Sequence, residues 1–342
     1  MMIKRNVKQA LLDSIEVLPN PVYKVVKWGG TGFVDSSFFE RYDIERYAEY
    51  LISNFDKEID RIANNNKCLV IRTLDYKSEY FTITFAHNIL NLIVYSMFKG
   101  YIPLIEVNEH DEGDINRWSW YFKSPSELYW KKYDINSFQK VECNITNSVF
   151  RATFRDVYHK KTRKIQTFLV NKFAVLKDDV QDYVNREINQ LLVGNMLGVL
   201  CRGTDYVTAK PKGHPVQPSI DMIIEDTRRM VELYGYDKIY VASEEKKIVE
   251  SFVKSFGKDV IVVNKRVYYD EFYSNKYFRV GDVAFNRDND RYLKGLEYIS
   301  SLHILSKCNA LLAGNCGGSS FSLFLNDGAY KMVRIYKLGY YK

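Results

Sequence analysis

The sequence predicts an α/β protein with parallel sheets, because short apolar runs alternate with longer stretches of helical periodicity. The run 68–71 is followed by a helix-like stretch over 85–98 and by a second apolar run over 102–107. Strand-helix-strand units of roughly 30 residues or more favour parallel pairing. A further long helix is expected over 173–193, with a break near 190–196.

A second series of strands and helices begins after this break. The expected strands are 196–200, 238–242, 260–263 and 310–313. The expected helices are 219–234, 246–256, 293–306 and 318–325. The two series predict two Rossmann-like domains facing a cleft. Ligands of such sheets lie beyond the carboxyl ends of the strands, so we expect a site in the loops that begin at Cys201, Ser243 and Gly314.

Residues 1–66 are expected to form an N-terminal helical appendage. Apolar residues within 44–62 recur at spacings of three and four and give one apolar face, for which core packing is the ordinary explanation. They are Tyr47, Leu51, Phe55, Ile59 and Ile62. The predicted units are therefore the appendage 1–66, a first Rossmann-like domain 67–195 and a second one 196–342.

The composition is that of a globular protein with a packed core. Of the 342 residues, 46% are hydrophobic and 15% are aromatic. The net charge of +7 suits an anionic ligand, a nucleic acid or an anionic membrane surface. Because the basic residues are interleaved with acidic ones instead of forming a stripe, the sequence disfavours a nucleic-acid-binding protein.

The cysteines and the apolar segments indicate a cellular compartment. The five cysteines are widely spaced and include no Cys-x-x-Cys pair, so neither a disulfide framework nor a zinc site is expected. Residues 1–18 carry charges throughout and lack the apolar core of a signal peptide. No stretch reaches ~18 consecutive apolar residues. We expect a cytoplasmic protein, with peripheral contact with the inner membrane left open.

The segment Cys201-Arg202-Gly203-Thr204-Asp205-Tyr206 directly follows an expected strand. Glycine lets the backbone approach a ligand closely, and arginine offers a planar fork of donors that suits phosphate. An ordinary turn with a surface arginine is an equal alternative. We take Arg202, Gly203, Asp205 and Tyr206 as candidate ligand-binding residues.

A glycine- and serine-rich loop opens the last expected helix. Free backbone N–H groups and hydroxyls at a helix N-terminus form a site for an anion. The candidate residues are Gly314, Gly317, Gly318, Ser319, Ser320 and Ser322. The loop is no Walker motif, because no Gly-Lys-Ser/Thr follows it. Together with the arginine segment, it indicates a diphosphate.

Further candidates each have a structural alternative. His214 lies in a proline-rich loop, where it would contact a diphosphate, act as an acid or base, or serve the structure of the loop. Glu244 and Glu245 follow a strand and would meet a ribose or base, or else favour the dipole of the next helix. His87 lies in an aromatic helix, where packing is its ordinary role.

These segments resemble the fucosyltransferase-like superfamily of inverting GT-B glycosyltransferases. The segment 201–206 is similar to the family's first donor motif, often His-x-Arg-Gly-Thr-Asp-Tyr in bacterial members, and 241–245 is similar to a strand that ends Ala-Thr-Asp-Asp. The loop and helix over 314–325 resemble the serine-rich segment that holds the donor phosphates, and 116–122 resembles an Asn-x-Trp-x-Tyr-Phe segment. The resemblance covers most of 67–342.

The resemblance implies a metal-independent enzyme without a cofactor that uses a nucleotide sugar, most commonly GDP-fucose. Its acceptor would be a glycan or glycolipid, bound on the side of the first domain, in the synthesis of a surface polysaccharide or glycoconjugate. Arg202 would bind the β-phosphate and stabilise the departing nucleoside diphosphate. The family's histidine has no counterpart just before Cys201, and Glu244-Glu245 replaces paired aspartates, so other donors stay open.

The general base is not assigned by the sequence. It should come from the first domain, where His87, Glu106 and Asp75 are candidates. With Arg202 and His214, His87 completes the set of candidate catalytic residues. Asp288-Asn289-Asp290 matches a metal-binding Asp-x-Asp by its letters only. The alternative from another class is a binding protein for nucleotide sugars or polysaccharides without turnover; a nucleic-acid partner is not expected, and the oligomeric state is not predicted.

Overall fold

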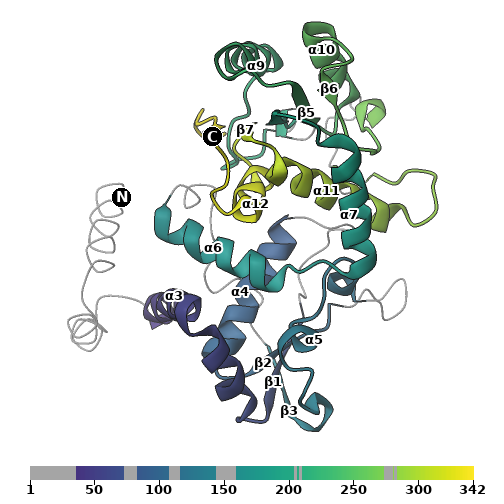
Figure 1. Ribbon diagram of the computed structural model, residues 1–342. Coiled ribbons are helices and arrows are strands. Elements are labelled where there is room, and N and C mark those ends of the chain that lie inside the picture. The colour runs from purple at the N-terminus through teal and green to yellow at the C-terminus, as the bar shows by residue number, and fades with distance from the viewer. Residues whose placement is uncertain are drawn as a thin grey trace.

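The computed structural model describes residues 36–72, 83–107, 116–143, 159–203, 206–207, 210–272, 280 and 283–342, without the side chains of 36–42 and 83–85. It contains a three-stranded sheet of order β2-β1-β3 and a five-stranded sheet of order β6-β5-β4-β7-β8. All strand pairs in both sheets are parallel. The predicted α/β class with parallel sheets is therefore confirmed (Figure 1).

The first sheet has short strands and packs against long helices. Its strands are β1 (Lys67–Ile71), β2 (Ile102–Ile105) and β3 (Gln139–Glu142). Its helices are α3 (Ser36–Ala63), α4 (Ile83–Phe98), α5 (Pro125–Tyr129) and α6 (Lys160–Phe173). Cys68 is aligned with Ile102 of β2 on one side and with Lys140 of β3 on the other. The crossover through α4 is the one that the sequence predicts.

The predicted apolar face of α3 is confirmed. Of the predicted residues, Leu51 and Ile62 are fully buried, Phe55 and Ile59 are buried, and Tyr47 is partly buried. Helix α3 packs against α4 and α6. One buried cluster continues from α3 through β1 and α4 into the last two helices of the chain. This helix is thus part of the packing around the first sheet, while the domain boundaries at 66 and 195 stay predictions.

The second sheet carries a layer of helices on each face. Its strands are β4 (Met196–Leu200), β5 (Lys238–Ala242), β6 (Ile261–Val262), β7 (Ala310–Ala313) and β8 (Met332–Ile335). Its helices are α7 (Asp178–Leu191), α9 (Ile220–Tyr234), α10 (Lys246–Phe256), α11 (Asp290–Lys307) and α12 (Gly317–Asn326). In Figure 1, α11 and α12 lie between this sheet and the helices of the first one.

Local sequence signals define the ends of these elements. Ser219 caps α9, because its side chain accepts a hydrogen bond from the backbone N–H of Met222. Gly235 ends the same helix in the left-handed conformation, with φ of 62°. Strand β4 is buried at every position, as a central parallel strand must be.

The predicted helix over 173–193 is wrong in its first part. Helix α6 ends at Phe173 and α7 begins only at Asp178. The backbone between them pairs with another segment: the N–H of Lys123 donates to the carbonyl of Val175 at 2.9 Å, and the N–H of Lys177 donates to that of Tyr121 at 2.9 Å. These long-range bonds replace the helical ones. Strand β6 is also shorter than the predicted 260–263.

No helix in the described part of the chain is long and apolar enough to cross a membrane.

Candidate functional site

Three strands of the second sheet end at one edge. Leu200 of β4 is aligned with Ala242 of β5 and with Ala313 of β7. The residues that follow these positions therefore emerge side by side, and among them are Arg202, Glu244 and the loop that opens α12. This edge is where a sheet of this type holds its ligand.

Arg202 is held in place by a carboxylate and an aromatic ring. Its Nη1 lies 3.5 Å from Oε1 of Glu244, and the two side chains are only 14% and 7% exposed. The guanidinium carbon lies 4.5 Å from the ring centroid of Tyr206, a cation–π arrangement. The predicted surface turn is therefore the less suitable interpretation, since this arginine is largely buried at the strand end.

The charge of Arg202 reaches the start of α12. Cys316 is the residue that precedes this helix, and burial raises the pKa of its thiol while the positive charge of Arg202 opposes the rise. The same charge acts on Tyr298, whose pKa burial raises and Arg202 lowers. The arginine segment and the glycine- and serine-rich loop, paired by sequence reasoning, follow neighbouring strands, and the N–H of Gly314 donates to the carbonyl of Leu200 at 3.2 Å.

Gly203 allows Glu245 to pack against the backbone. A Cβ atom at Gly203 would lie 1.7 Å from Oε1 of Glu245, so a larger residue cannot occupy this position without displacing the carboxylate. The Glu245 side chain is 4% exposed, and its Oε2 lies 3.0 Å from Nζ of Lys247. Close approach, and not a positive φ, is what requires glycine here.

The two glutamates do not cap α10, although their position before this helix allows that role. Asp270, from the loop after β6, accepts from the backbone N–H groups of Lys246 at 2.7 Å and Lys247 at 3.1 Å. The same loop reaches Glu244, whose carbonyl accepts from the N–H of Tyr269 at 3.0 Å. Both glutamate side chains are thereby directed toward the Arg202 segment.

The serine hydroxyls at the start of α12 bond to the chain itself. Ser319 Oγ donates to the carbonyl of Cys316 at 2.8 Å and Ser320 Oγ donates to the same carbonyl at 3.2 Å. Ser322 Oγ donates to the carbonyl of Leu302 at 3.4 Å. The first backbone N–H groups of the helix, at Gly317 and Gly318, are the donors that such a helix end can offer to a ligand.

The proline-rich loop is bonded to the C-terminal segment and to the loop before α12. The N–H of Gly213 donates to the carbonyl of Tyr341 at 2.8 Å, and the N–H of Tyr341 donates to the carbonyl of His214 at 2.9 Å. Gln217 Nε2 donates to the carbonyl of Asn315 at 2.9 Å, in the loop before α12.

His214 lies next to Tyr206, which in turn packs against Arg202. Its ring lies 5.2 Å from that of Tyr206 in an edge-on contact. Three predicted site residues therefore meet, while Asp205 lies outside the described residues. Gly314 also fits tightly, because a Cβ atom there would lie 2.1 Å from Oε1 of Gln217.

The candidate bases of the first half have other surroundings. His87 packs against Phe321 and Phe324 of α12, with ring centroids 6.2 and 5.9 Å away, and burial lowers its pKa to about 4. Glu106 is paired with Arg72 at 2.6 Å and lies 3.6 Å from Lys140. Asp75 lies outside the described residues.

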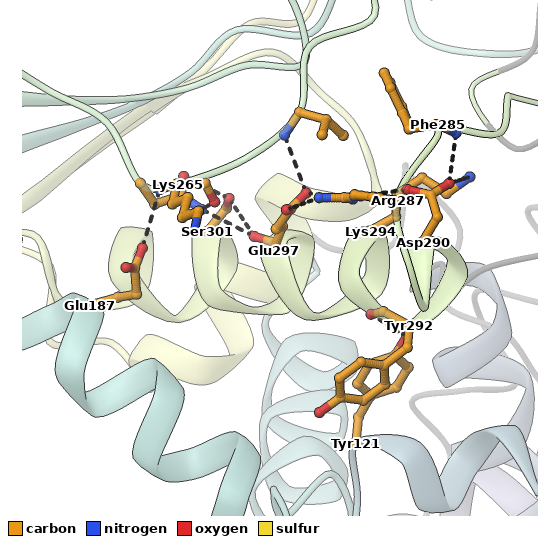
Figure 2. A network of polar contacts seen from close by, with 12 residues as sticks. Tyr121, Glu187, Lys265, Phe285, Arg287, Asp290, Tyr292, Lys294, Glu297 and Ser301 are labelled. Carbon is orange, nitrogen blue, oxygen red and sulfur yellow. Dashed lines mark hydrogen bonds and ion pairs between the residues drawn. The ribbon is translucent and has the colours of Figure 1, made fainter.

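A polar network on α11 holds the loop that carries Asp270 (Figure 2). Arg287 bonds Asp290 through Nε and Glu297 through Nη1, both at 2.6 Å. Glu297 in turn accepts from the N–H of Val267 at 3.3 Å, and Lys294 lies 3.2 Å from Asp290. The last carboxylate of the Asp-x-Asp letters thus has cationic partners, and Glu297 is engaged in pairing within the chain.

Sequence reasoning did not identify four residues that shape this edge. They are Gln217, Asp270, Tyr298 and Asn315. Gln217 lies in the proline-rich loop and Asn315 in the glycine- and serine-rich loop, both of which the sequence indicates as parts of the site. Their position in these loops was therefore a signal that could have identified them. Asp270 and Tyr298 have no local pattern that marks them.

Comparison with known proteins gives distant matches. No known protein-family model matches the chain. The chain is 26% identical over 204 residues to the zinc metalloproteinase R519 of Acanthamoeba polyphaga mimivirus. The aligned region covers 53% of this chain and 31% of that protein. The chain therefore spans less than a third of this relative. The His-Glu-x-x-His signature of zinc peptidases does not occur in the sequence.

Solved structures of fucosyltransferases resemble this chain distantly. The α-1,6-fucosyltransferase NodZ soaked with GDP-fucose has a TM-score of 0.45 and 9% identity, over 75% of this chain and 91% of that one. NodZ from Bradyrhizobium has a TM-score of 0.44 and 8% identity over the same shares, 75% and 91%. POFUT1 in complex with GDP-fucose has a TM-score of 0.39 and 12% identity, over 84% and 79%.

Proposed function

We propose that this protein is a glycosyltransferase that binds the diphosphate of a nucleotide sugar between Arg202 and the N-terminus of α12. The observation that carries the proposal is the setting of Arg202, which is held by Glu244 and Tyr206 at a strand end, beside the strand that leads into the loop before α12. A fixed guanidinium beside helix N–H groups is suited to a phosphate group.

The same arrangement suits the departure of a nucleoside diphosphate. Breaking the bond between sugar and phosphate develops negative charge on the leaving group, and preorganised donors stabilise that charge without rearranging. Arg202 would take the β-phosphate, and the N–H groups of Gly317 and Gly318 would take the remaining oxygens. His214, beside Tyr206, would line the wall of the donor site.

GDP-fucose is the donor to test first, because the sequence segments 201–206 and 314–325 resemble those of fucosyltransferases. A glycan or glycolipid would be the acceptor, and the reaction would proceed with inversion at the transferred carbon. Cytoplasmic location and peripheral contact with a membrane belong to the same proposal.

A binding protein without turnover is the second candidate, and one observation favours it. Within the described residues, neither candidate base of the first half is suited to accept a proton: burial lowers the pKa of His87 to about 4, and Glu106 is engaged by Arg72. A base with a low pKa removes a proton from a sugar hydroxyl poorly at neutral pH.

Thermal unfolding with GDP, UDP, CDP and dTDP and their sugars tests the site. A ligand that binds only the folded protein stabilises it by about 2.7 kcal/mol at a hundredfold excess over Kd, and we expect this shift with one nucleotide class. Arg202→Ala should remove the shift, whereas Arg228→Ala, a matched charge loss on the exposed surface of α9, should keep it. An unchanged shift in Arg202→Ala would refute the site.

Turnover decides between the two candidate functions. Release of free sugar or transfer to an added glycan, lost in Arg202→Ala, would establish a transferase. Binding of a nucleotide sugar with neither hydrolysis nor transfer across a panel of acceptors would favour the binding protein.

A further inference from the structure

A cavity lies away from the Arg202 site, at the other end of α12. It has a volume of about 920 Å³ and opens between α6, α3 and the turn that connects α12 to β8. Figure 1 shows α6 lying between α3 and α12. Because α12 extends from Gly317 to Asn326, its ten residues separate the two sites by roughly 15 Å.

One wall of the cavity is a row of cationic and amide side chains on α6. The row consists of Lys160, Arg163, Lys164, Thr167 and Asn171, and Lys172 stands beside it. Spacings of three and four place such residues on one face of a helix. The wall therefore presents several positive charges and hydrogen-bonding groups to the same open cavity.

Three positive charges of this wall lack a carboxylate partner among the described residues. No carboxylate there forms an ion pair with Lys160, Arg163 or Lys164, although Lys161 of the same helix pairs with Glu49 at 3.1 Å. Asp327 is the carboxylate that lines the cavity. A cluster of like charges in a concave site favours an anionic ligand.

Aromatic rings form another part of the lining, and the two tyrosine hydroxyls among them are already used. Tyr129, Phe168 and Tyr330 face the cavity. The hydroxyl of Tyr129 donates to the carbonyl of Lys172 at 2.7 Å, and that of Tyr330 donates to the carbonyl of Leu305 at 2.8 Å. The rings are thereby fixed and offer apolar surface, while the amides and hydroxyls of α6 remain for polar contacts.

We propose that this cavity binds an acidic oligosaccharide. Sugar rings offer C–H faces for the aromatic rings and hydroxyls for Thr167 and Asn171, and a carboxylate or phosphate substituent would meet Arg163 and Lys164. The volume is that of a site for a compact ligand of a few sugar units. Identifying this ligand as the acceptor chain, anchored at a distance from the reacting end, rests on the proposed function.

Binding of defined oligosaccharides to the full chain tests the cavity by calorimetry. We expect the acidic tetragalacturonate to bind at least tenfold more tightly than the neutral maltotetraose. The double variant Arg163→Ala/Lys164→Ala should weaken tetragalacturonate at least tenfold. The control Arg228→Ala/Arg229→Ala removes the same charge from the exposed surface of α9 and should bind as the unaltered protein does.

Several outcomes would overturn the proposal. They are no measurable binding of tetragalacturonate, equal binding of the neutral sugar, or equal loss in both double variants. Tighter binding of phosphatidylserine vesicles or of a short RNA, lost in the α6 variant alone, would assign the cavity to those partners instead. Melting curves of each variant verify folding, and a single Lys164→Ala variant serves if the double variant unfolds.

The cavity and the donor site are tested independently. Arg202→Ala should leave tetragalacturonate binding unchanged, because Arg202 lies at the opposite end of α12 from the cavity. Failure of nucleotide binding would then refute the proposed function without refuting the oligosaccharide site. Failure of oligosaccharide binding would refute that site without refuting the proposed function.

Discussion

Removing the charge of Arg202 should destabilise the protein through the carboxylate that remains. At the observed 3.5 Å separation from Glu244, the gross attraction is about 5 kcal/mol at an effective dielectric constant near 20. Since the Glu244 side chain is only 7% exposed, Arg202→Met leaves a buried charge without its partner. We expect the free energy of unfolding to fall by about 3 kcal/mol, the range found when one member of a buried pair is removed.

A double-mutant cycle separates this pairing from the role in binding. Glu244→Gln removes the stranded charge, so the variant Arg202→Met/Glu244→Gln should regain at least about 1 kcal/mol relative to Arg202→Met. Urea unfolding of the four proteins gives the coupling energy. The thermal shift produced by the nucleotide should stay absent in the double variant, because the phosphate has lost its arginine.

Two results would contradict this reasoning. Additivity of the two single changes within about 0.5 kcal/mol would mean that the pair is not coupled. A nucleotide shift that returns in the double variant would mean that Arg202 acts on the ligand only by neutralising Glu244.

Two further predictions concern Gly203 in the site and His87 on α4. Gly203→Ala should cost about 1–3 kcal/mol of unfolding free energy and weaken nucleotide binding, because its Cβ would lie 1.7 Å from Oε1 of Glu245. In Gly213→Ala the Cβ meets open space but φ is +80°, so about 1 kcal/mol should be lost without an effect on that carboxylate; equal nucleotide binding in both variants would contradict the close-approach argument. His87 has a folded pKa of about 4 against an ordinary 6.5, so the fold favours its neutral form, and the stabilisation present above pH 6.5 is lost as the pH falls toward 4. Urea midpoints over this range should depend less on pH in His87→Gln, and an equal dependence would show that this histidine is not protonated on unfolding.

The edge of the second sheet is predictable because its determinants are local. Buried parallel strands are continuous apolar runs, and polar or glycine residues follow β4, β5 and β7 within two positions. Once these strands are parallel and adjacent, their ends must share one edge. For this reason the sequence alone points to Arg202 and Glu244 as neighbours in a site.

Other elements depend on partners that no local pattern reveals. The polar strand β3, Gln139–Glu142, is a strand because it pairs with β1, and its own side chains are mostly exposed. The break between α6 and α7 exists because Lys123 and Tyr121 bond the intervening backbone. Likewise, the residue that caps α10 is Asp270, about two dozen positions from the N–H groups that it accepts from.

The direction of the serine hydroxyls has the same origin. The composition of the loop before α12 indicates donors, but a hydroxyl also bonds its own backbone when the helix turn brings a carbonyl within reach. Ser319 and Ser320 both donate to Cys316, so the anion site that the sequence indicates would be made of backbone N–H groups. Sequence alone does not distinguish these two sets of donors.

The loops of this edge are each fastened to a distant part of the chain. Residues 213–216 are bonded to the C-terminal segment 339–341, and the loop after β6 is bonded both to α11 through Glu297 and to α10 through Asp270. Arg202, in turn, is placed by Glu244 on the neighbouring strand end. Hydrogen-bond donors that are fixed before the ligand binds do not need to reorganise when negative charge develops on the leaving group. Electrostatic stabilisation of the transition state depends mainly on this preorganisation. If Arg202 binds the diphosphate as proposed, the bonds at Tyr341 and Asp270 would therefore matter for its chemistry, even though neither residue belongs to the proposed site.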